Sequence, residues 1–207
     1  MNKLVYVDVG ARGGIKQFWR LQKDLLDVHA FEPNKDEWEP LKKWIWWEEA
    51  NLYPYALWRF PATLDLYVTK DPGLTSVYKP RQLHERMEVV RTDQVEARTL
   101  DSFELKPDFI KVDVQGAELD VLRGAEKSIE ECTGVEAEVS YQQGYEGQPL
   151  FDDITHFMNS RGFSLWRTTA TRMLFDGVWF TDAIYLKDGT EGTKKRAMIE
   201  AAYPKGD

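Results

Sequence analysis

The chain has 207 residues and a formal net charge of −8, with 27 Lys or Arg against 35 Asp or Glu. This length suits one domain with a sizeable core, and the acidic balance argues against nucleic-acid binding, which needs a basic face. The single cysteine, Cys132, excludes an intramolecular disulfide, and no apolar run approaches the ~20 residues of a membrane span. With no charged-then-apolar leader before the first strand, we expect a soluble cytoplasmic protein without a membrane partner.

The first predicted element is a strand over residues 4–9 that runs into a glycine turn. Gly10, Gly13 and Gly14 follow the strand directly, and a helical pattern then begins. Strand, glycine turn and helix in this order are typical of a nucleotide-binding βαβ unit, because glycines let the backbone approach a ligand and the helix start offers unpaired N–H groups. The alternative is an ordinary strand-to-helix loop whose glycines serve geometry only.

The next predicted strand, residues 28–32, ends in the acid Glu32. This acid lies roughly 20 residues beyond the glycine turn, where dinucleotide-binding folds place the carboxylate that accepts from the ribose hydroxyls. The turn reads Gly-x-x-Gly-Gly, which lacks the glycine spacing that seats a pyrophosphate. A ligand with a ribose and no phosphates, such as S-adenosylmethionine, therefore fits better, and Asp8 is placed to accept from its ammonium group. The alternative for Glu32 is a solvated charge at a strand end.

Two helices and an insertion are predicted in the first half of the chain. Helical spacing of Ile15, Phe18, Leu21 and Leu25 predicts a helix over residues 14–26. A second helix is expected over residues 36–49, where the tryptophans at 38, 44, 46 and 47 are either core packing with a partly exposed ring or an aromatic surface for a sugar or a partner chain. Strand three is expected over residues 51–58, followed by an extra strand or hairpin in an insertion of about residues 59–98.

Strands and helices also alternate in the second half. Strands are predicted over residues 109–114, 134–141, 163–167 and 178–186, and helices over residues 118–130 and 151–161. The alternation predicts an α/β fold with a mostly parallel sheet and helices on both faces. We expect one domain over residues 1–188 and a charged, weakly helical, peripheral tail over residues 189–207.

Five short motifs of the chain resemble those of the FkbM-type methyltransferases. They are Val7-Asp8-Val9-Gly10-Ala11, Phe31-Glu32-Pro33-Asn34, Thr99-Leu100-Asp101-Ser102-Phe103, the run from Asp108 to Glu118, and Val121-Leu122-Arg123-Gly124-Ala125. They occur in the order found in that family, and the resemblance spans about residues 5–185. Arg12 stands where Asn is frequent in the family, and Gln115 where Glu is frequent.

The resemblance implies a Rossmann-like class I methyltransferase fold with a mostly parallel seven-stranded sheet and a small β insertion after strand three. It also implies S-adenosylmethionine as cofactor and O-methylation of a hydroxyl on a sugar, glycan or natural product. The family carries a Gly-x-x-Ser element in its insertion, which Ser76 matches; turn formation is the alternative for this serine.

Polar side chains gather where the predicted strands end, which is where open α/β sheets bind ligands. A sugar hydroxyl is a poor nucleophile, so a base that takes its proton is expected to add roughly 10² to 10⁴ in rate. The predicted catalytic residues are Asp113, the first choice for this base, Glu138, the second choice, and Lys111. The predicted cofactor-binding residues are Asp8, Gly10, Ala11, Arg12, Gly13, Glu32, Pro33, Asn34, Ser76, Val114 and Gln115.

Four other interpretations remain. Lys111 and Asp113 form part of a structural ion-pair network, with Glu136 or Glu138 as the partner of Lys111. Asp113, Glu118 and Glu138 form a divalent-cation site, although no metal is our main expectation. The protein is an NAD-dependent oxidoreductase, against which the glycine spacing and Asp8 count. The last is a non-catalytic binding protein on the same fold.

Overall fold

The computed structural model describes residues 3–44, 50–169, 171–173 and 179–204. A central sheet has the strand order β10-β11-β8-β7-β1-β2-β3, and β9 also pairs with β11. The strands are β1 (Leu4–Val9), β2 (Leu26–Phe31), β3 (Asn51–Tyr53), β7 (Phe109–Val112), β8 (Gly134–Ser140), β9 (Phe163–Thr168), β10 (Arg172–Met173) and β11 (Trp179–Lys187). The adjacent strands β8, β7, β1, β2 and β3 run parallel, and β11 is antiparallel to β8 and β9. The predicted mostly parallel α/β sheet is confirmed, with the two-residue β10 as an additional strand.

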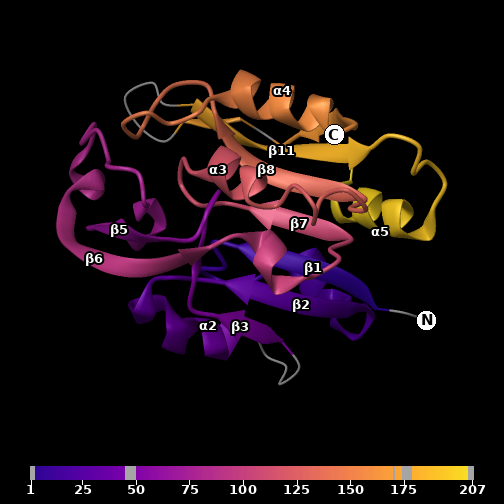
Figure 1. Ribbon diagram of the computed structural model, residues 1–207, viewed down its shortest axis with the longest axis horizontal. Coiled ribbons are helices and arrows are strands. Elements are labelled where there is room, and N and C mark those ends of the chain that lie inside the picture. Colours follow the sequence, from indigo (N-terminus) through magenta and orange to yellow (C-terminus); the bar gives the residue numbers. More distant parts are fainter. Residues whose placement is uncertain (1–2, 45–49, 170, 174–178, 205–207) are drawn as a thin grey trace.

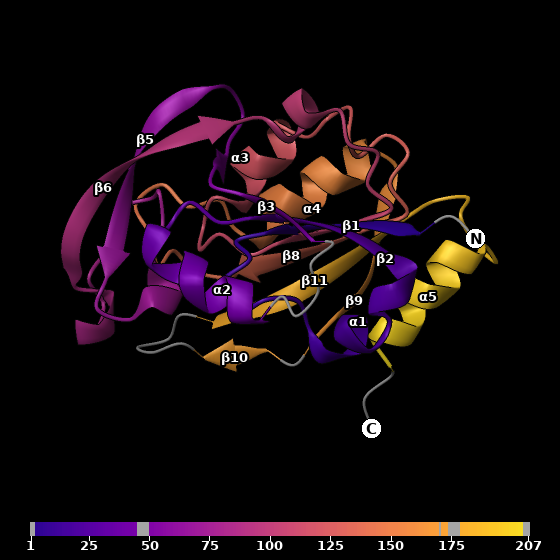
Figure 2. The same cartoon turned by 90° about the horizontal axis from the view of Figure 1, so that it is seen from below.

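Helices cover both faces of this sheet, as predicted (Figure 2). One face carries α3 (Glu118–Arg123) and α4 (Phe151–Ser160), and the other carries α1 (Gln17–Leu21), α2 (Trp38–Trp44) and α5 (Lys194–Ala202). Alternate residues of the strands supply a separate apolar core on each side, because successive side chains in a strand point to opposite faces. Short 3₁₀ helices span Lys23–Leu25, Lys35–Glu37, Pro72–Leu74, Glu85–Met87 and Leu100–Phe103. None of the described helices is long and apolar enough to cross a membrane.

Two predicted helices are shorter than expected. The helix predicted over residues 14–26 is reduced to α1 and the 3₁₀ helix Lys23–Leu25, and Leu21 is 74% exposed while Trp19 is fully buried. The helix predicted over residues 118–130 ends before Gly124, where a Cβ would lie 2.0 Å from the carbonyl oxygen of Trp58. Of the helix predicted over residues 36–49, the structure describes α2 and its preceding 3₁₀ turn. Trp46, Trp47 and the side chain of Trp44 lie outside the described residues.

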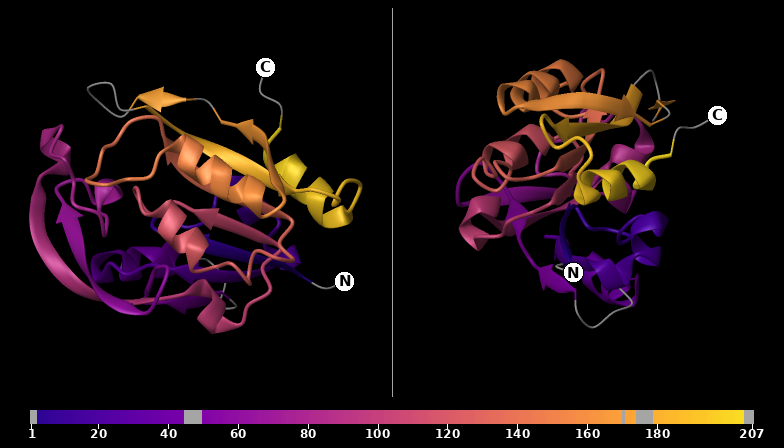
Figure 3. Two further views of the ribbon diagram at one scale, coloured as in Figure 1. Left: turned by 45° about the horizontal axis from the view of Figure 1, so that its top comes forward. Right: turned by 90° about the vertical axis from the view of Figure 1, so that its right-hand side faces the viewer.

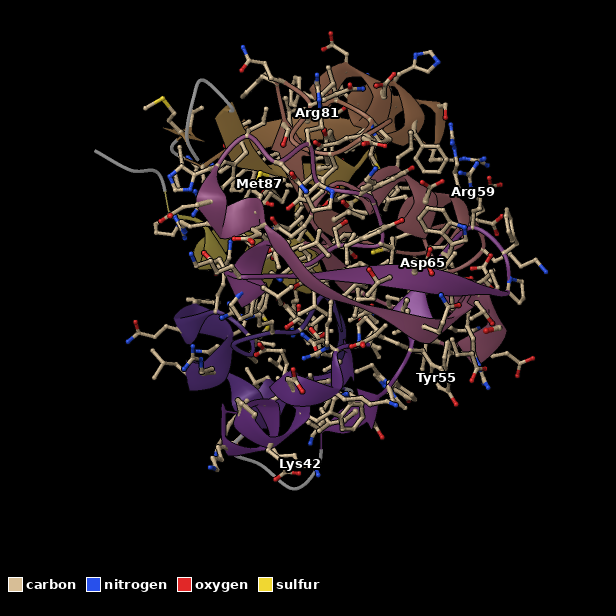
Figure 4. All side chains as sticks on the ribbon, turned by 90° about the vertical axis from the view of Figure 1, so that its left-hand side faces the viewer. Lys42, Tyr55, Arg59, Asp65, Arg81 and Met87 are labelled. Atoms are coloured by element: carbon tan, nitrogen blue, oxygen red, sulfur yellow. The ribbon has the colours of Figure 1, made fainter. Side chains whose placement is uncertain are left out.

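The segment predicted as strand three is divided between two sheets. After β3, the chain passes through Pro54 into β4 (Ala56–Leu57), which pairs with β6 (Val89–Arg98) in a second sheet that also contains β5 (Ala62–Thr69). The long hairpin of β5 and β6 stands at one end of the molecule in Figure 1, opposite α5. Figure 4 looks onto this end and shows Tyr55 below the hairpin, with Met87 and Arg81 above it. The hairpin therefore lies beside the edge of the main sheet that holds the carboxyl ends of β1, β2 and β7.

The prediction of a peripheral C-terminal tail is wrong. In both views of Figure 3, α5 packs beside the sheet. Ile199 is fully buried and Tyr203 nearly so, and the Tyr203 hydroxyl donates to the carboxylate of Glu136 in β8. The sequence did not indicate this contact, because the segment is mostly charged and only one side of α5 carries buried side chains. An isolated Ile and Tyr give a weak helical pattern.

Candidate functional site

A pocket opens at the carboxyl ends of β1, β2 and β7 and is covered on one side by the insertion. We call it the glycine-turn pocket. Of the residues predicted to bind cofactor or to act in catalysis, those that line it are Gly10, Arg12, Glu32, Pro33, Asn34, Ser76, Asp113, Val114 and Gln115. The ends of three strands thus meet in one cavity, as the carboxyl-end rule for open α/β sheets leads one to expect, and Ser76 of the insertion joins them.

The glycine turn fixes how closely two of these segments approach. The backbone N–H groups of Gly10 and Ala11 both donate to the carbonyl of Phe31 at the end of β2. Gly10 has a φ of +76°, and a Cβ at this position would lie 1.9 Å from the carbonyl oxygen of Asp113. Glycine is therefore required here both for backbone conformation and for space.

Glu32 ends β2 and presents a carboxylate to the pocket. Its Oε1 accepts from the backbone N–H of Asn34 at 2.8 Å, and the backbone N–H of Arg12 also stabilises its charge. Burial outweighs these hydrogen bonds and raises the pKa of Glu32 to about 7. The residue is 6% exposed, so it is a desolvated carboxylate rather than the solvated strand-end charge of the alternative interpretation.

Asp8 is not among the residues that line the pocket, so its contact with a cofactor ammonium group stays a prediction. It is fully buried and pairs in register with Lys111, whose Nζ donates to Asp8 Oδ1 at 3.1 Å. The side chain of Asp8 points to the face of the sheet covered by α1 and α5, because Asp8 follows Tyr6 by two positions in β1. Burial raises the pKa of Asp8, and the Lys111 cation limits that rise.

Lys111 is a buried cation between two carboxylates and lies in neither pocket. Besides Asp8, its Nζ is 3.6 Å from Asp113 Oδ2. Burial lowers the pKa of Lys111, but the carboxylates around it more than compensate, so the net shift is upward. Glu136, one of the two partners suggested for Lys111, pairs with it in register, and its charge adds to the upward shift of the Lys111 pKa. The side-chain hydrogen bonds of Glu136 involve Lys16 and Tyr203. Lys111 therefore contacts the pocket residue Asp113 without lining either pocket, and its catalytic role stays a prediction.

Two further residues predicted to bind cofactor shape the turn without lining the pocket. Ala11 is fully buried and packs against Ala30 and Leu41 beneath α2. Gly13 is exposed, with a φ of +78° and no atom within 4 Å of the position a Cβ would take. The structure gives both residues a local role in the course of the backbone.

A second pocket adjoins the first, and we call it the Glu138 pocket. The two share Arg12, Gly73 and Gln115 as lining residues. The Glu138 pocket is lined further by Asp71, Leu74, Arg86, Gly116, Glu118, Glu138, Ser140, Gly144, Tyr145, Gln148 and Phe180. Arg86, Tyr145, Gln148 and Phe180 were not predicted, because they come from the insertion, from the loop after β8 and from β11, and no local motif marks them.

Two carboxylates of the Glu138 pocket, Glu138 and Glu118, differ in their contacts. Burial, with the neighbouring carboxylates of Asp113 and Glu118, raises the pKa of Glu138 well above its usual value. Glu118 accepts from the backbone N–H groups of Val114 and Gly116, and burial raises its pKa to about 7. Glu118 is thus engaged in holding the loop after β7. Among the described residues, no group of three or more His, Cys, Asp or Glu side chains is arranged to hold a metal ion.

The mostly parallel sheet of this strand order, with antiparallel β11 beside β8, a glycine turn after β1 and an acid at the end of β2, is the class I methyltransferase fold that the solved structures below share. Residues 8–165 match the Methyltransferase FkbM domain, so the chain belongs to the FkbM methyltransferase family. The match confirms the predicted family and the predicted enzyme class, a methyltransferase dependent on S-adenosylmethionine. No curated protein matches the chain.

Solved structures share the fold at low sequence identity. Magnesium protoporphyrin IX methyltransferase from Synechocystis, with bound S-adenosylmethionine, has a TM-score of 0.52 and 12% identity, covering 90% of this chain and 71% of that chain. A ribosomal protein L11 methylase from Lactobacillus delbrueckii subsp. bulgaricus has a TM-score of 0.50 and 15% identity, covering 90% and 72%. A putative RNA methyltransferase from Pyrococcus horikoshii has a TM-score of 0.50 and 11% identity, covering 90% and 76%. These similarities concern the fold alone.

Proposed function

We propose that this protein transfers the methyl group of S-adenosylmethionine to a hydroxyl of a sugar, glycan or natural product. The observation that carries the proposal is the pair of adjoining pockets that share Arg12, Gly73 and Gln115. Methyl transfer needs the donor and the nucleophile held in line, and two pockets with a common wall supply such an arrangement.

The glycine-turn pocket is the proposed cofactor site. Glu32 would accept from the ribose hydroxyls, and the Gly10 turn gives the ligand close access to backbone. Pro33, Asn34, Ser76 and Val114 complete the proposed set of cofactor contacts, all of them lining residues of this pocket. S-adenosylmethionine would supply an electrophilic methyl group on a sulfonium. The positive charge of the sulfonium is compatible with the carboxylates of Asp113 and Glu138, which contact the shared residue Gln115.

The Glu138 pocket is the proposed acceptor site. Asp113 and Glu138 are the candidate bases for the acceptor hydroxyl, one at the edge of each pocket. The surroundings of Glu138 favour it as the base, because a desolvated carboxylate with a raised pKa is a stronger base near neutral pH. Asp113 has a side chain that is 34% exposed and a cation, Lys111, beside it.

We further propose that the acceptor is a small molecule or a glycan rather than a nucleic acid. The net charge of −8 supports this, since phosphate backbones require basic surfaces. The carboxylates of Asp71, Glu118 and Glu138 in the acceptor pocket also disfavour a negatively charged nucleic acid. The two arginines of that pocket are already paired: Arg86 with Asp71, and Arg12 with Glu37 at 3.2 Å.

The test is a methyl-transfer assay with labelled S-adenosylmethionine against sugars, nucleotide sugars, polyketides and RNA. We expect transfer to a hydroxyl of one of the first three classes, and transfer to RNA alone would contradict the proposal. Asp113→Asn and Glu138→Gln identify the base: replacing it should lower kcat by about 10² or more with cofactor affinity nearly kept. Asp8→Asn, which disturbs Lys111 from outside both pockets, is the matched comparison and should lower stability instead.

The NAD-dependent alternative has a direct test in the same preparation. A ligand that binds the folded state raises the melting temperature. We expect S-adenosylmethionine, and not NAD, to raise it.

A further inference from the structure

Gln115 has an unfavourable backbone conformation at the boundary of the two pockets. It follows β7 by three residues and has a φ of +58°, in the left-handed region that favours glycine. Two other non-glycine residues in the described part of the chain, Gln82 and Glu104, also have positive φ, and both side chains are exposed. Gln115 is partly buried instead. A residue held in such a conformation is kept there by its surroundings, and such positions cluster at functional sites.

Both N–H groups of the Gln115 side-chain amide donate hydrogen bonds. Its Nε2 donates one hydrogen bond to Asp113 Oδ1 at 2.8 Å and one to Glu138 Oε2 at 2.7 Å. Its Oε1 lies 3.3 Å from the hydroxyl of Tyr145, whose single proton is shared between this oxygen and the carbonyl of Leu74 at 3.0 Å in the insertion. The opposite orientation of the amide would set its oxygen against two carboxylates. The contacts therefore fix which way the amide points.

Both candidate bases depend on this one amide group. Two carboxylates that share a site repel each other, and a proton on one of them relieves the repulsion. Donation of one N–H to each offsets this repulsion without a proton. Glu138 also faces charged or titratable groups from every element packed around it: Asp113 after β7, Glu118 at the start of α3, Asp182 in β11, Arg172 in β10, and Tyr145 in the loop after β8.

We propose that Gln115 is a positioning residue for methyl transfer: its amide holds Asp113 and Glu138 side by side and keeps Glu138 able to accept the proton of the acceptor hydroxyl. This inference rests on the function proposed above. A glutamate would add a third negative charge within hydrogen-bond distance of the other two and would have no N–H to donate.

The test follows the titration of the Glu138 carboxyl by ¹³C NMR in the ligand-free protein, with Glu138→Gln used to assign the signal. Gln115→Leu removes both donors, and Gln115→Glu keeps the shape but adds a charge. We expect the titration midpoint of Glu138 to rise by about one pH unit or more in Gln115→Leu and further in Gln115→Glu. Affinity for S-adenosylmethionine is measured by calorimetry in both variants, as the readout that reports a cofactor contact.

Gln82→Leu is the matched control, because it makes the same substitution at an exposed glutamine with a φ of +52°. It should leave the Glu138 midpoint where it is. If Gln115→Leu does not fold, Gln115→Glu carries the test. An unmoved midpoint in the folded variant overturns the inference. So does a loss of cofactor affinity of about tenfold with the midpoint unmoved, which would make Gln115 a cofactor contact.

The titration needs no acceptor, so its result is separate from that of the methyl-transfer assay. A failure of every acceptor in the panel would contradict the proposed function and leave the Glu138 midpoints as measured. When an acceptor is found, the acid limb of the pH–rate profile should move to higher pH in Gln115→Leu, in the same direction as the midpoint.

Discussion

Glu32 is the residue whose ionisation bears most directly on the proposed cofactor site. Its carboxylate lies at the end of β2 in the glycine-turn pocket and is held there by the backbone N–H of Asn34. A pKa of about 7 means that the charge of Glu32 changes within the physiological range. The charged form accepts hydrogen bonds from a ribose more strongly than the protonated form does.

We therefore expect ribose-containing ligands to bind more weakly as pH falls from 8 to 6, because Glu32 takes up a proton in this interval. The suitable probe is 5′-methylthioadenosine, which has the ribose but no amino-acid part that titrates. Its dissociation constant, measured by calorimetry, should rise toward low pH in the unmodified protein. In Glu32→Gln it should be about ten- to a hundredfold higher at pH 8 and independent of pH. Equal dissociation constants at pH 6 and pH 8 in the unmodified protein would remove Glu32 from the ribose site.

At the scale of elements, α5 is the part of the structure that the sequence pattern described least well. It closes the core on the face of the sheet that holds Trp19, Tyr6 and Phe109. Its contacts are both apolar and polar: Ile199 is fully buried, Lys195 pairs with Asp108, and the Tyr203 hydroxyl donates to Glu136. The helix therefore belongs to the folding unit of the methyltransferase domain.

Ile199→Ala should lower the free energy of unfolding by about 2–5 kcal/mol, since it leaves a cavity between α5 and the sheet. Lys194→Ala, at an exposed position of the same helix, is the control and should change it by about 0.5 kcal/mol or less. Urea unfolding measures both. Similar small effects from the two substitutions would mean that α5 contributes little to stability, as a peripheral tail would.

At the scale of the whole molecule, buried acids give stability an unusual dependence on pH. Burial raises the pKa values of Glu32 and Glu118 to about 7 and also raises those of Asp8, Glu136 and Glu138. Their values in the unfolded chain are near 4.5 or below. Between the two values the folded state binds more protons than the unfolded state does. The stability contributed by these groups is fully present below the unfolded pKa and is lost as pH rises through the folded pKa.

We expect the free energy of unfolding of the ligand-free protein to fall as pH rises from 5 to 7. Each such carboxyl contributes a slope of at most about 1.4 kcal/mol per pH unit. Glu118→Gln should reduce the slope, because its amide oxygen can still accept from Val114 and Gly116 but the side chain no longer titrates. Urea titrations at pH 5, 6 and 7 measure both slopes. A stability that rises over this interval would contradict the expectation.

Much of the fold and part of the site could be predicted from the sequence, because these features depend on residues that are close in the chain. The glycine turn at Gly10 and the acid that ends the next strand, Glu32, lie within one βαβ unit. The alternation of strands with helices was sufficient to predict the layers of the fold. The carboxyl-end rule predicted that Asp113 and Glu138 lie at one edge of the sheet.

Only the tertiary structure decided which of these polar residues face a pocket and which face the core. Asp8 lies two positions before Gly10, which lines the glycine-turn pocket, yet the side chain of Asp8 is buried against Lys111. Strand register and the covering helices set these surroundings. The joint contact of Gln115 with Asp113 and Glu138 spans two strands, and the wall at Arg86 and Tyr145 comes from an insertion and a loop. Such contacts depend on distances between segments far apart in the chain, which local periodicity and short motifs do not contain.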